Sequence, residues 1–272
     1  MAHSVLGDIH THTLYSRHAY STILENIQVA HARGLEVYGA ADHFGSMMSP
    51  TVDIRDYQFF LNVMVWPREW EDMLVLRGAE VDIVGLDGAL FGQDIEISEN
   101  IVKRPYPART TLFNAALSKV DYLVASVHNG LFARGASLAQ TTDMYLSVLD
   151  NPKVFILGHT GRSGIPYDLD AVLLRAKETH KLIEINEHSF DGGPAGSCTE
   201  TCRTIAERCA ELGVGIAVST DAHIATDIAL YPRALAMLEE IHFPEELIMT
   251  RSRAALVEEL AASGVCDLRD IS

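Results

Sequence analysis

Residues 4–12 read SVLGDIHTH, and this stretch decides the fold because a short apolar segment ends there in two histidines, His10 and His12. Six further segments rich in Val, Ile, Leu and Ala recur along the chain with helical patterns between them. Such alternation is typical of repeated β/α units around a parallel sheet, and fully apolar strands suit a sheet covered on both faces. We therefore predict an α/β fold with strands near 4–10, 37–42, 74–80, 122–127, 154–157, 182–186 and 214–220.

The helices between these strands carry readable end signals. Thr22 and Glu25 have the spacing of a capping box, and Gly34 follows a periodic run that ends at Arg33. Proline is well suited to the first turn of a helix, where its missing N–H is not needed. We expect further helices at 168–180 and 199–212, with Gly213 after the second, and helix starts at Pro232 and Pro244.

The length of 272 residues leaves the number of domains open, since α/β barrels of this size commonly form one unit. No low-complexity linker and no sequence repeat divides the chain. We expect a single barrel-like domain over residues 1–272. Residues 44–73 are the main irregular excursion, and we predict a helix or lid there, over the site.

The composition, with 48% hydrophobic and 21% charged residues, is typical of a soluble globular protein. No apolar run approaches the ~20 residues of a membrane span, and the start MAHSVLGDIH lacks the features of a secretory signal, so we expect a cytoplasmic protein without a membrane partner. The formal net charge of -16 argues against an extended nucleic-acid surface. A small anionic substrate stays compatible with it, because bound divalent ions set the local charge of a site.

Polar residues stop the apolar segments in a recurring way. His10 and His12 are two residues apart, so in an extended chain both project to the same side and can meet one ion. The stretches AADH, GAE, ASVH, ILGH and STDAH end later segments, and the carboxyl ends of parallel barrel strands share one face. Nine donors are too many for one ion, which suggests two or three ions with a shared carboxylate. The nine are His10, His12, His18, His43, Glu80, His128, His159, Asp221 and His223.

Each histidine taken singly also fits a hydrogen-bonded loop residue without a metal, but seven in register favour a metal site. The sixth strand end differs from the others, because Asn186, Glu187 and His188 crowd there. These three side chains fit substrate contact or proton donation to a leaving oxygen. Alternatively, Glu187 and His188 form a local structural pair.

Three loop arginines follow or precede these donors in the sequence: Arg17, Arg134 and Arg162. A planar guanidinium suits phosphate binding, and a solvated surface position is the alternative for each. Arg162, in the stretch GHTGRSG, is the first candidate for neutralising phosphate charge without binding metal.

The stretches DIHTH, ADH, GAE, SVH, GH and STDAH resemble the motifs of the polymerase and histidinol phosphatase (PHP) superfamily, over nearly the whole chain. DIHTHTLYSRHAYST together with GAEVDIVGLDG looks most like the bacterial YcdX-type phosphatases. This resemblance implies a distorted, TIM-like (β/α)7 barrel with three metal ions at the carboxyl ends of the strands.

The resemblance also implies a ligand set. His10, His12, Glu80 and Asp221 would bind the first metal, and Glu80 would bridge to a second ion held by His128 and His159. His18, His43 and His223 would bind the third. Asp8 would orient a metal-bound imidazole, as carboxylates commonly do. Zinc is the expected metal, with manganese or iron as alternatives that the ligand types do not separate.

The function implied is metal-dependent hydrolysis of small phosphomonoesters by a hydroxide shared between two ions. Asp221, Glu80, Arg162 and His188 are the residues expected to serve catalysis. Histidinol-phosphate hydrolysis and phosphodiester or nuclease cleavage of short nucleotides are alternative reactions. An alternative of another class is a non-catalytic, metal-binding regulatory domain, against which the full set of nine donors argues. The oligomeric state stays open.

Overall fold

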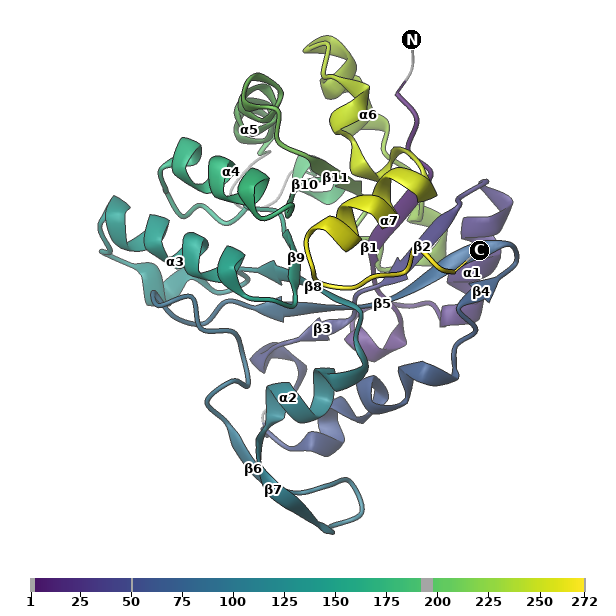
Figure 1. The fold of residues 1–272 in the computed structure, drawn as a ribbon, viewed down its shortest axis with the longest axis vertical. Coiled ribbons are helices and arrows are strands. Elements are labelled where there is room, and N and C mark those ends of the chain that lie inside the picture. The colour runs from purple at the N-terminus through teal and green to yellow at the C-terminus, as the bar shows by residue number, and fades with distance from the viewer. Residues whose placement is uncertain (1–2, 50, 192–197, 272) are drawn as a thin grey trace.

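The computed structural model describes residues 3–49, 51–191 and 198–271, and seven parallel strands follow one another around it (Figure 1). Hydrogen bonds join each strand to the next, and β1 lies beside β11, with an isolated bridge from Thr11 to Ala222 in the segment after β11. The sheet is therefore nearly closed into a TIM-like α/β barrel, as predicted. Its strands are β1 (Gly7–Thr11), β2 (Val37–Ala40), β5 (Met73–Asp82), β8 (Tyr122–Ser126), β9 (Val154–Leu157), β10 (Leu182–Asn186) and β11 (Ile216–Ser219).

Helices surround the barrel, and α3 to α6 pack against one another in succession along its outside (Figure 1). The predicted capping box of Thr22 and Glu25 is present at the start of α1, and Gly213 ends α5 in the left-handed conformation. Pro232 opens α6 as predicted. The α-helices are α1 (Ile23–Ala32), α2 (Leu112–Ala116), α3 (Leu138–Asp150), α4 (Leu169–Glu178), α5 (Thr199–Leu212), α6 (Pro232–Glu240) and α7 (Arg253–Ala262).

The prediction for Pro244 was wrong in extent. Pro244 precedes only a short 3-10 turn, Glu245–Leu247, and α7 starts later. The Ser252 side chain caps α7 by accepting a hydrogen bond from the backbone N–H of Ala255. A proline fixes its own backbone angle, but this single constraint does not set the length of the helix that follows.

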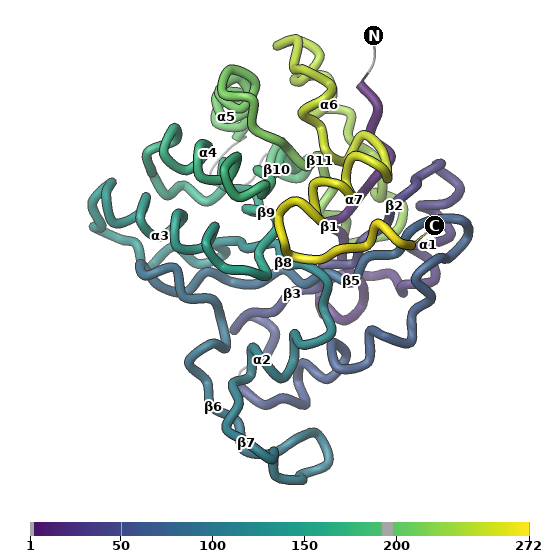
Figure 2. Tube along the Cα trace, viewed as in Figure 1, coloured from purple at the N-terminus to yellow at the C-terminus, as the bar shows by residue number. Residues whose placement is uncertain are grey.

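The excursion over residues 44–73 is built mainly of 3-10 turns and short strands. It contains β3 (His43–Phe44), β4 (Glu69–Trp70) and the 3-10 segments Ser46–Met48 and Ile54–Val65. A second excursion, which we did not predict, follows β5: the antiparallel hairpin of β6 (Glu96–Glu99) and β7 (Pro105–Thr111). This hairpin projects away from the body of the barrel (Figure 2).

The two ends of the barrel differ. Near the amino-terminal ends of the strands, Leu256 and Leu260 of α7 pack with Ile9, Leu74 and Tyr122 in one buried apolar cluster. The carboxyl ends carry the conspicuous buried polar residues instead, among them His10, His12, Glu80, His159 and Asp221. Buried polar groups are costly unless they are paired or ligated, so this end is where a site is expected. No helix in the described ranges has the length and apolarity to cross a bilayer.

Candidate metal centre

The nine predicted donors converge at the carboxyl ends of the strands. They come from β1 and the loop after it, from the start of β3, from β5, and from the turns after β8, β9 and β11. Their side chains range from fully buried, as in His10 and His12, to 26% exposed in His223, with His18 exposed at the rim. Residues up to 213 positions apart, His10 and His223, thus share one cluster because parallel strands deliver their ends to one face.

Glu80 lies at the centre of this cluster. Its Oε1 is 2.9 Å from His159 Nε2, and its Oε2 is 2.7 Å from His43 Nδ1. Altogether five imidazoles place a ring nitrogen 2.7–3.6 Å from the carboxylate: those of His10, His12, His43, His128 and His159. A carboxylate so surrounded can be shared by more than one ion.

Asp221 forms a second focus. Its Oδ1 is 3.0 Å from His12 Nε2 and 3.7 Å from His10 Nε2, while its Oδ2 accepts a hydrogen bond of 2.9 Å from Arg162. Asp221 and His159 both have positive φ angles, 57° and 29°. Non-glycine residues in this region are uncommon and gather at functional sites, where the surrounding structure holds them.

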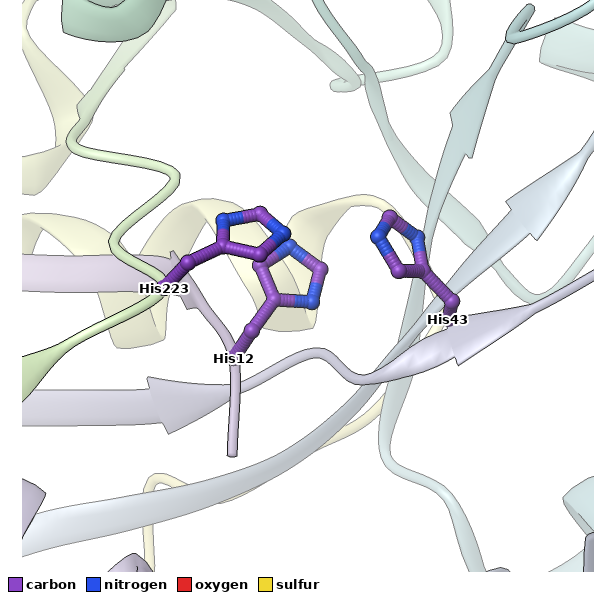
Figure 3. A group of neighbouring side chains, drawn as sticks. All are labelled: His12, His43 and His223. Carbon is purple, nitrogen blue, oxygen red and sulfur yellow. The ribbon is translucent and has the colours of Figure 1, made fainter. Parts of the chain in front are cut away.

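The third group lies nearer the surface. His18 Nε2 is 2.9 Å from His223 Nε2 and 3.3 Å from His43 Nε2. Figure 3 shows His12 and His223 beside each other, with His43 across from them, and the His12 ring centroid is 4.2 Å from that of His223. Two nitrogens bound to one tetrahedral zinc at ~2.0–2.1 Å are roughly 3.3 Å apart, so these spacings suit a shared ion.

The residues fit a metal cluster by a further test, the state of their buried polar atoms. In the part of the chain that the structure describes, His10 Nε2 and Glu80 Oε2 are buried without a well-aligned hydrogen bond, although His43 Nδ1 lies 2.7 Å from Glu80 Oε2, and His159 Nδ1 is buried without a hydrogen bond as well. Buried orphan groups of this kind are expensive, and coordination of an ion by the first two would remove the cost. Imidazole with carboxylate suits zinc, manganese or iron.

The grouping agrees with the expected ligand sets in part. Ligand atoms of His10, His12 and Asp221 lie within 4.8 Å of one another, as expected for the first ion. His43, however, faces two groups, because its Nδ1 approaches Glu80 while its Nε2 approaches His18. It therefore lies between the second and third expected sites.

The carboxylates of the cluster are held ionised. Burial opposes ionisation of Glu80, but the imidazoles of His10, His128 and His43 outweigh it and hold its pKa well below the ordinary value. Burial likewise opposes ionisation of Asp221, and His10 and His12 hold its pKa well below the ordinary range. Both side chains can therefore serve as anionic ligands.

Behind three imidazoles lie partners that sequence reasoning missed. Glu184 lies 2.6 Å from His10 Nδ1, and Asp82 lies 2.6 Å from His128 Nδ1. Ser16 lies 2.9 Å from His12 Nδ1 and donates to Asp42. One signal was present in the sequence, because Asp42 directly precedes His43 and Asp82 follows Glu80 by two residues, on the same side of an extended strand.

Asp8 does not orient an imidazole, contrary to our expectation. Its carboxylate accepts hydrogen bonds from the backbone N–H and hydroxyl of Thr220 and from the backbone N–H of Ala229. Burial raises its pKa to about 6. Asp8 thus holds the turn that precedes Asp221, because it points to the β11 side of β1 rather than into the cluster.

The three predicted arginines differ in their position relative to the cluster. Arg162 lines a cavity of about 840 Å³ above the cluster, together with His43, His128 and His159. Arg17 does not line this cavity: its side chain is 52% exposed and lies 3.5 Å from Asp56. Arg134 is exposed, with no side-chain partner among the described residues, and also lies outside the cavity lining. The surface alternative therefore describes these two arginines.

At the end of β10, Asn186, Glu187 and His188 each make a different kind of contact. The Asn186 amide lies 3.2 Å from Glu184 and 3.3 Å from Asp221, so it faces the cluster. Glu187 accepts backbone hydrogen bonds from Arg233 and Ala234 at the start of α6, which is a structural role. His188 lines the cavity, and its Nδ1 is 3.0 Å from Asp191, not from Glu187.

Comparison with known proteins adds an independent finding. The PHP domain model matches residues 8–188. A probable phosphatase from Clostridium acetobutylicum is 36% identical over 259 residues, which is 95% of this chain and 96% of the relative. Another probable phosphatase, from Caldanaerobacter subterraneus, is 36% identical over 245 residues, 90% of this chain and 87% of the relative.

A solved structure also resembles the barrel: histidinol phosphate phosphatase from Lactococcus lactis, complexed with zinc, L-histidinol and phosphate. The TM-score is 0.53 at 16% sequence identity, over 88% of this chain and 94% of the other. At that identity the likeness is one of fold.

Proposed function

The chain belongs to the PHP domain family, and we propose that it is a metal-dependent phosphatase that hydrolyses phosphomonoesters of small molecules. The observation that carries this proposal is the Glu80 carboxylate, which is buried among imidazoles that line a cavity and has both oxygens within 3 Å of a ring nitrogen, His159 Nε2 at 2.9 Å and His43 Nδ1 at 2.7 Å. Relatives that match nearly the full length and are named probable phosphatases support the reaction class.

We assign two or three divalent ions to the cluster, zinc first, with manganese or iron as alternatives. His10, His12, Glu80 and Asp221 would hold the first ion, Glu80 with His128 and His159 the second, and His18, His43 and His223 the third. When bound, the ions supply Lewis-acid charge and an activated water for attack on phosphorus.

The protein's own groups would bind the substrate and manage its proton. Arg162 lies at the cavity wall with its guanidinium beside Asp221, where it can donate to a phosphate oxygen. His188 lies on the same cavity, backed by Asp191, where it can protonate the leaving oxygen. The side-chain amide of Asn186 donates a hydrogen bond of 3.3 Å to Asp221 Oδ2 and so holds this carboxylate in place.

The cavity favours a small ester over a nucleic acid. Its volume of about 840 Å³ lies within the range of roughly 300–1,000 Å³ that is usual for small-molecule sites. Its rim carries Glu187, Asp191 and Asp227 alongside Arg162 and Arg233, so it lacks the run of cations that a phosphate backbone requires. We therefore rank phosphodiester cleavage below phosphomonoester cleavage.

Two further alternatives fit the site less well. Histidinol phosphate is a candidate substrate because the L. lactis structure contains L-histidinol and phosphate. At 16% sequence identity, this likeness only makes it one of the esters to be assayed. A non-catalytic metal site would be expected to close its coordination, whereas here His18, His43 and His223 open onto the cavity.

A substrate panel tests the proposal. Protein stripped by a chelator and reloaded with zinc or manganese is assayed for phosphate release from aryl, alkyl and histidinol phosphomonoesters and from a diaryl diester. We expect monoester turnover that exceeds diester turnover, and a loss of more than about 100-fold in kcat/KM for Glu80→Gln. Metal-loaded protein that hydrolyses none of the monoesters would refute the proposal.

The extent of the domain and the location stay predictions from the sequence. We propose one PHP domain over residues 1–272 and a cytoplasmic protein.

A further inference from the structure

Glu184 is a fully buried carboxylate in the middle of β10 that the proposed chemistry does not use. Its Oε1 lies 2.6 Å from His10 Nδ1 and close to Ser219 Oγ. Its Oε2 accepts from the backbone N–H of His159 at 2.7 Å and lies 3.2 Å from the Asn186 amide nitrogen. Four polar groups from four different chain positions therefore meet one carboxylate.

We propose that Glu184 is a positioning residue for the metal centre: its carboxylate fixes the proton of His10 on Nδ1, so that Nε2 is free for an ion, and it also holds the loop of His159. This inference rests on the metal-binding role proposed above.

The direction of the hydrogen bonds supports the assignment. An ionised carboxylate only accepts, so His10 must carry its proton on Nδ1 to bond with Glu184 at 2.6 Å. In a ring protonated only on Nδ1, the other nitrogen, Nε2, is the atom that an ion can bind, and it lies 3.4 Å from Glu80 and 3.7 Å from Asp221. It also has no hydrogen-bond partner among the residues that the structure describes. A ring nitrogen that faces two carboxylates is placed to share an ion with them.

The reach of Glu184 extends to three of the nine donors. His10 and His159 contact it directly, and Asn186 links it to Asp221, whose Oδ2 is 3.3 Å from the same amide nitrogen. These donors come from β1 and from the turns after β9 and β11. One side chain on β10, a strand that supplies no donor of its own, thus ties together donors from three other strands.

The Glu184→Gln variant tests this positioning role, because glutamine has nearly the same shape as glutamate but a different hydrogen-bonding pattern. The backbone N–H of His159 cannot become an acceptor, so Gln at this position keeps its oxygen toward His159. Its amide NH2 then faces His10 Nδ1, which must give up its proton to accept. The proton moves to Nε2 and blocks the nitrogen that an ion needs.

The experiment compares wild type with Glu184→Gln in metal-stripped protein. Zinc affinity and stoichiometry are measured by competition with a chromogenic chelator and by elemental analysis, and the His10 tautomer by nitrogen NMR of the labelled ring. We expect zinc affinity at one site to fall by about 10 to 100-fold, with His10 protonated on Nε2 in the stripped variant. Unchanged affinity, or an unchanged His10 tautomer, would overturn the proposal.

Matched variants separate positioning from general stability. Asp121→Asn removes a carboxylate at the opposite end of the barrel, where it contacts Arg68 and the backbone N–H of Arg77, and zinc affinity should not change. Glu184→Asp keeps the charge and should retain more zinc affinity than Glu184→Gln, which keeps the test valid if the Gln variant does not fold. Equal losses in Asp121→Asn, or in Glu184→Asp and Glu184→Gln, would overturn the proposal.

No substrate enters these measurements, so failure of this inference is distinguishable from failure of the proposed function. Wild-type protein whose zinc binding depends on Glu184 but that hydrolyses no phosphomonoester would contradict only the function. Wild-type protein that binds no divalent metal would contradict both.

Discussion

At the scale of single residues, Arg162 is the group that we propose for binding a phosphate oxygen. Its side chain is 29% exposed and donates to Asp221 at 2.9 Å, and no other side chain in the described ranges accepts from it. The remaining guanidinium donors can therefore face the cavity that Arg162 lines.

We expect Arg162→Lys to lower kcat/KM for an aryl phosphomonoester by about 10 to 100-fold, because a lysine keeps the charge but loses the planar, bidentate donors. Metal content should stay at the wild-type value. Arg175→Lys is the control, since Arg175 is exposed and pairs with Asp150 on the outside of the barrel. Full activity in Arg162→Lys with all metals bound would remove Arg162 from substrate binding.

His188 makes a prediction about the leaving group. If it protonates the leaving oxygen, His188→Asn should lower kcat for an alkyl phosphomonoester by about 100-fold or more. A nitrophenyl ester should be little affected, because nitrophenolate leaves without a proton. Steady-state kinetics on both esters decide the matter, and an equal loss on the two esters would exclude proton donation by His188.

Eight of the nine clustered residues could be predicted from strand ends, because each ends or closely follows an apolar segment, as His43 and His159 do, whereas His18 lies in the loop after the first strand. The residues behind them could not. Glu184 stands in the strand segment LIEIN, and nothing in one sequence distinguishes an inward-facing strand carboxylate from a solvated one before the register is known. The prediction that Asp8 orients an imidazole was wrong for the same reason, because the spacing of Asp8 and His10 in the sequence does not tell which neighbour the Asp8 carboxylate contacts.

At the scale of elements, the seven barrel strands and the helices α1, α4, α5 and α6 were predicted, whereas α2, α3, α7 and the β6–β7 hairpin were not. Thr22 and Gly213 are local signals that act through their own backbone, so they could be read without the fold. The β6–β7 hairpin has mostly exposed residues on both faces, so it shows no alternation of apolar and polar side chains to detect.

Packing between elements makes a prediction at Gly78 of β5. A Cβ there would lie 2.6 Å from the ring of Tyr122 of β8 and 2.9 Å from the carbonyl oxygen of Ala40, and these neighbours cannot easily move. Gly78→Ala should therefore lower the free energy of unfolding by about 1–3 kcal/mol. Gly7→Ala is a matched strand control, because its Cβ would meet only atoms at 3.5 Å or beyond.

Chemical denaturation of the two variants measures the difference. The cost of Gly78→Ala should shrink when Tyr122 is shortened in Tyr122→Leu, since the two changes share one space. A Gly78→Ala variant as stable as Gly7→Ala would show that the slot between β5 and β8 is not tight.

At the scale of the whole molecule, one end of the barrel stabilises the fold and the other carries the proposed metal centre. Its amino-terminal end is filled by apolar side chains and covered by α7, while its carboxyl end gathers buried imidazoles and carboxylates beneath a cavity. The formal net charge of -16 makes bound cations the expected source of positive charge at that end. Metal binding should therefore determine both the activity and the stability of the barrel end where the carboxyl ends of the strands lie.

The most direct test is a titration of zinc into chelator-stripped protein, with bound metal per chain and phosphate release from an aryl phosphomonoester measured on the same samples. We predict no turnover in the stripped protein, binding of two or three zinc ions per chain, and activity that appears as these sites fill. Saturation at fewer than two ions per chain, or full phosphatase activity in the stripped protein, would contradict the proposed metal centre.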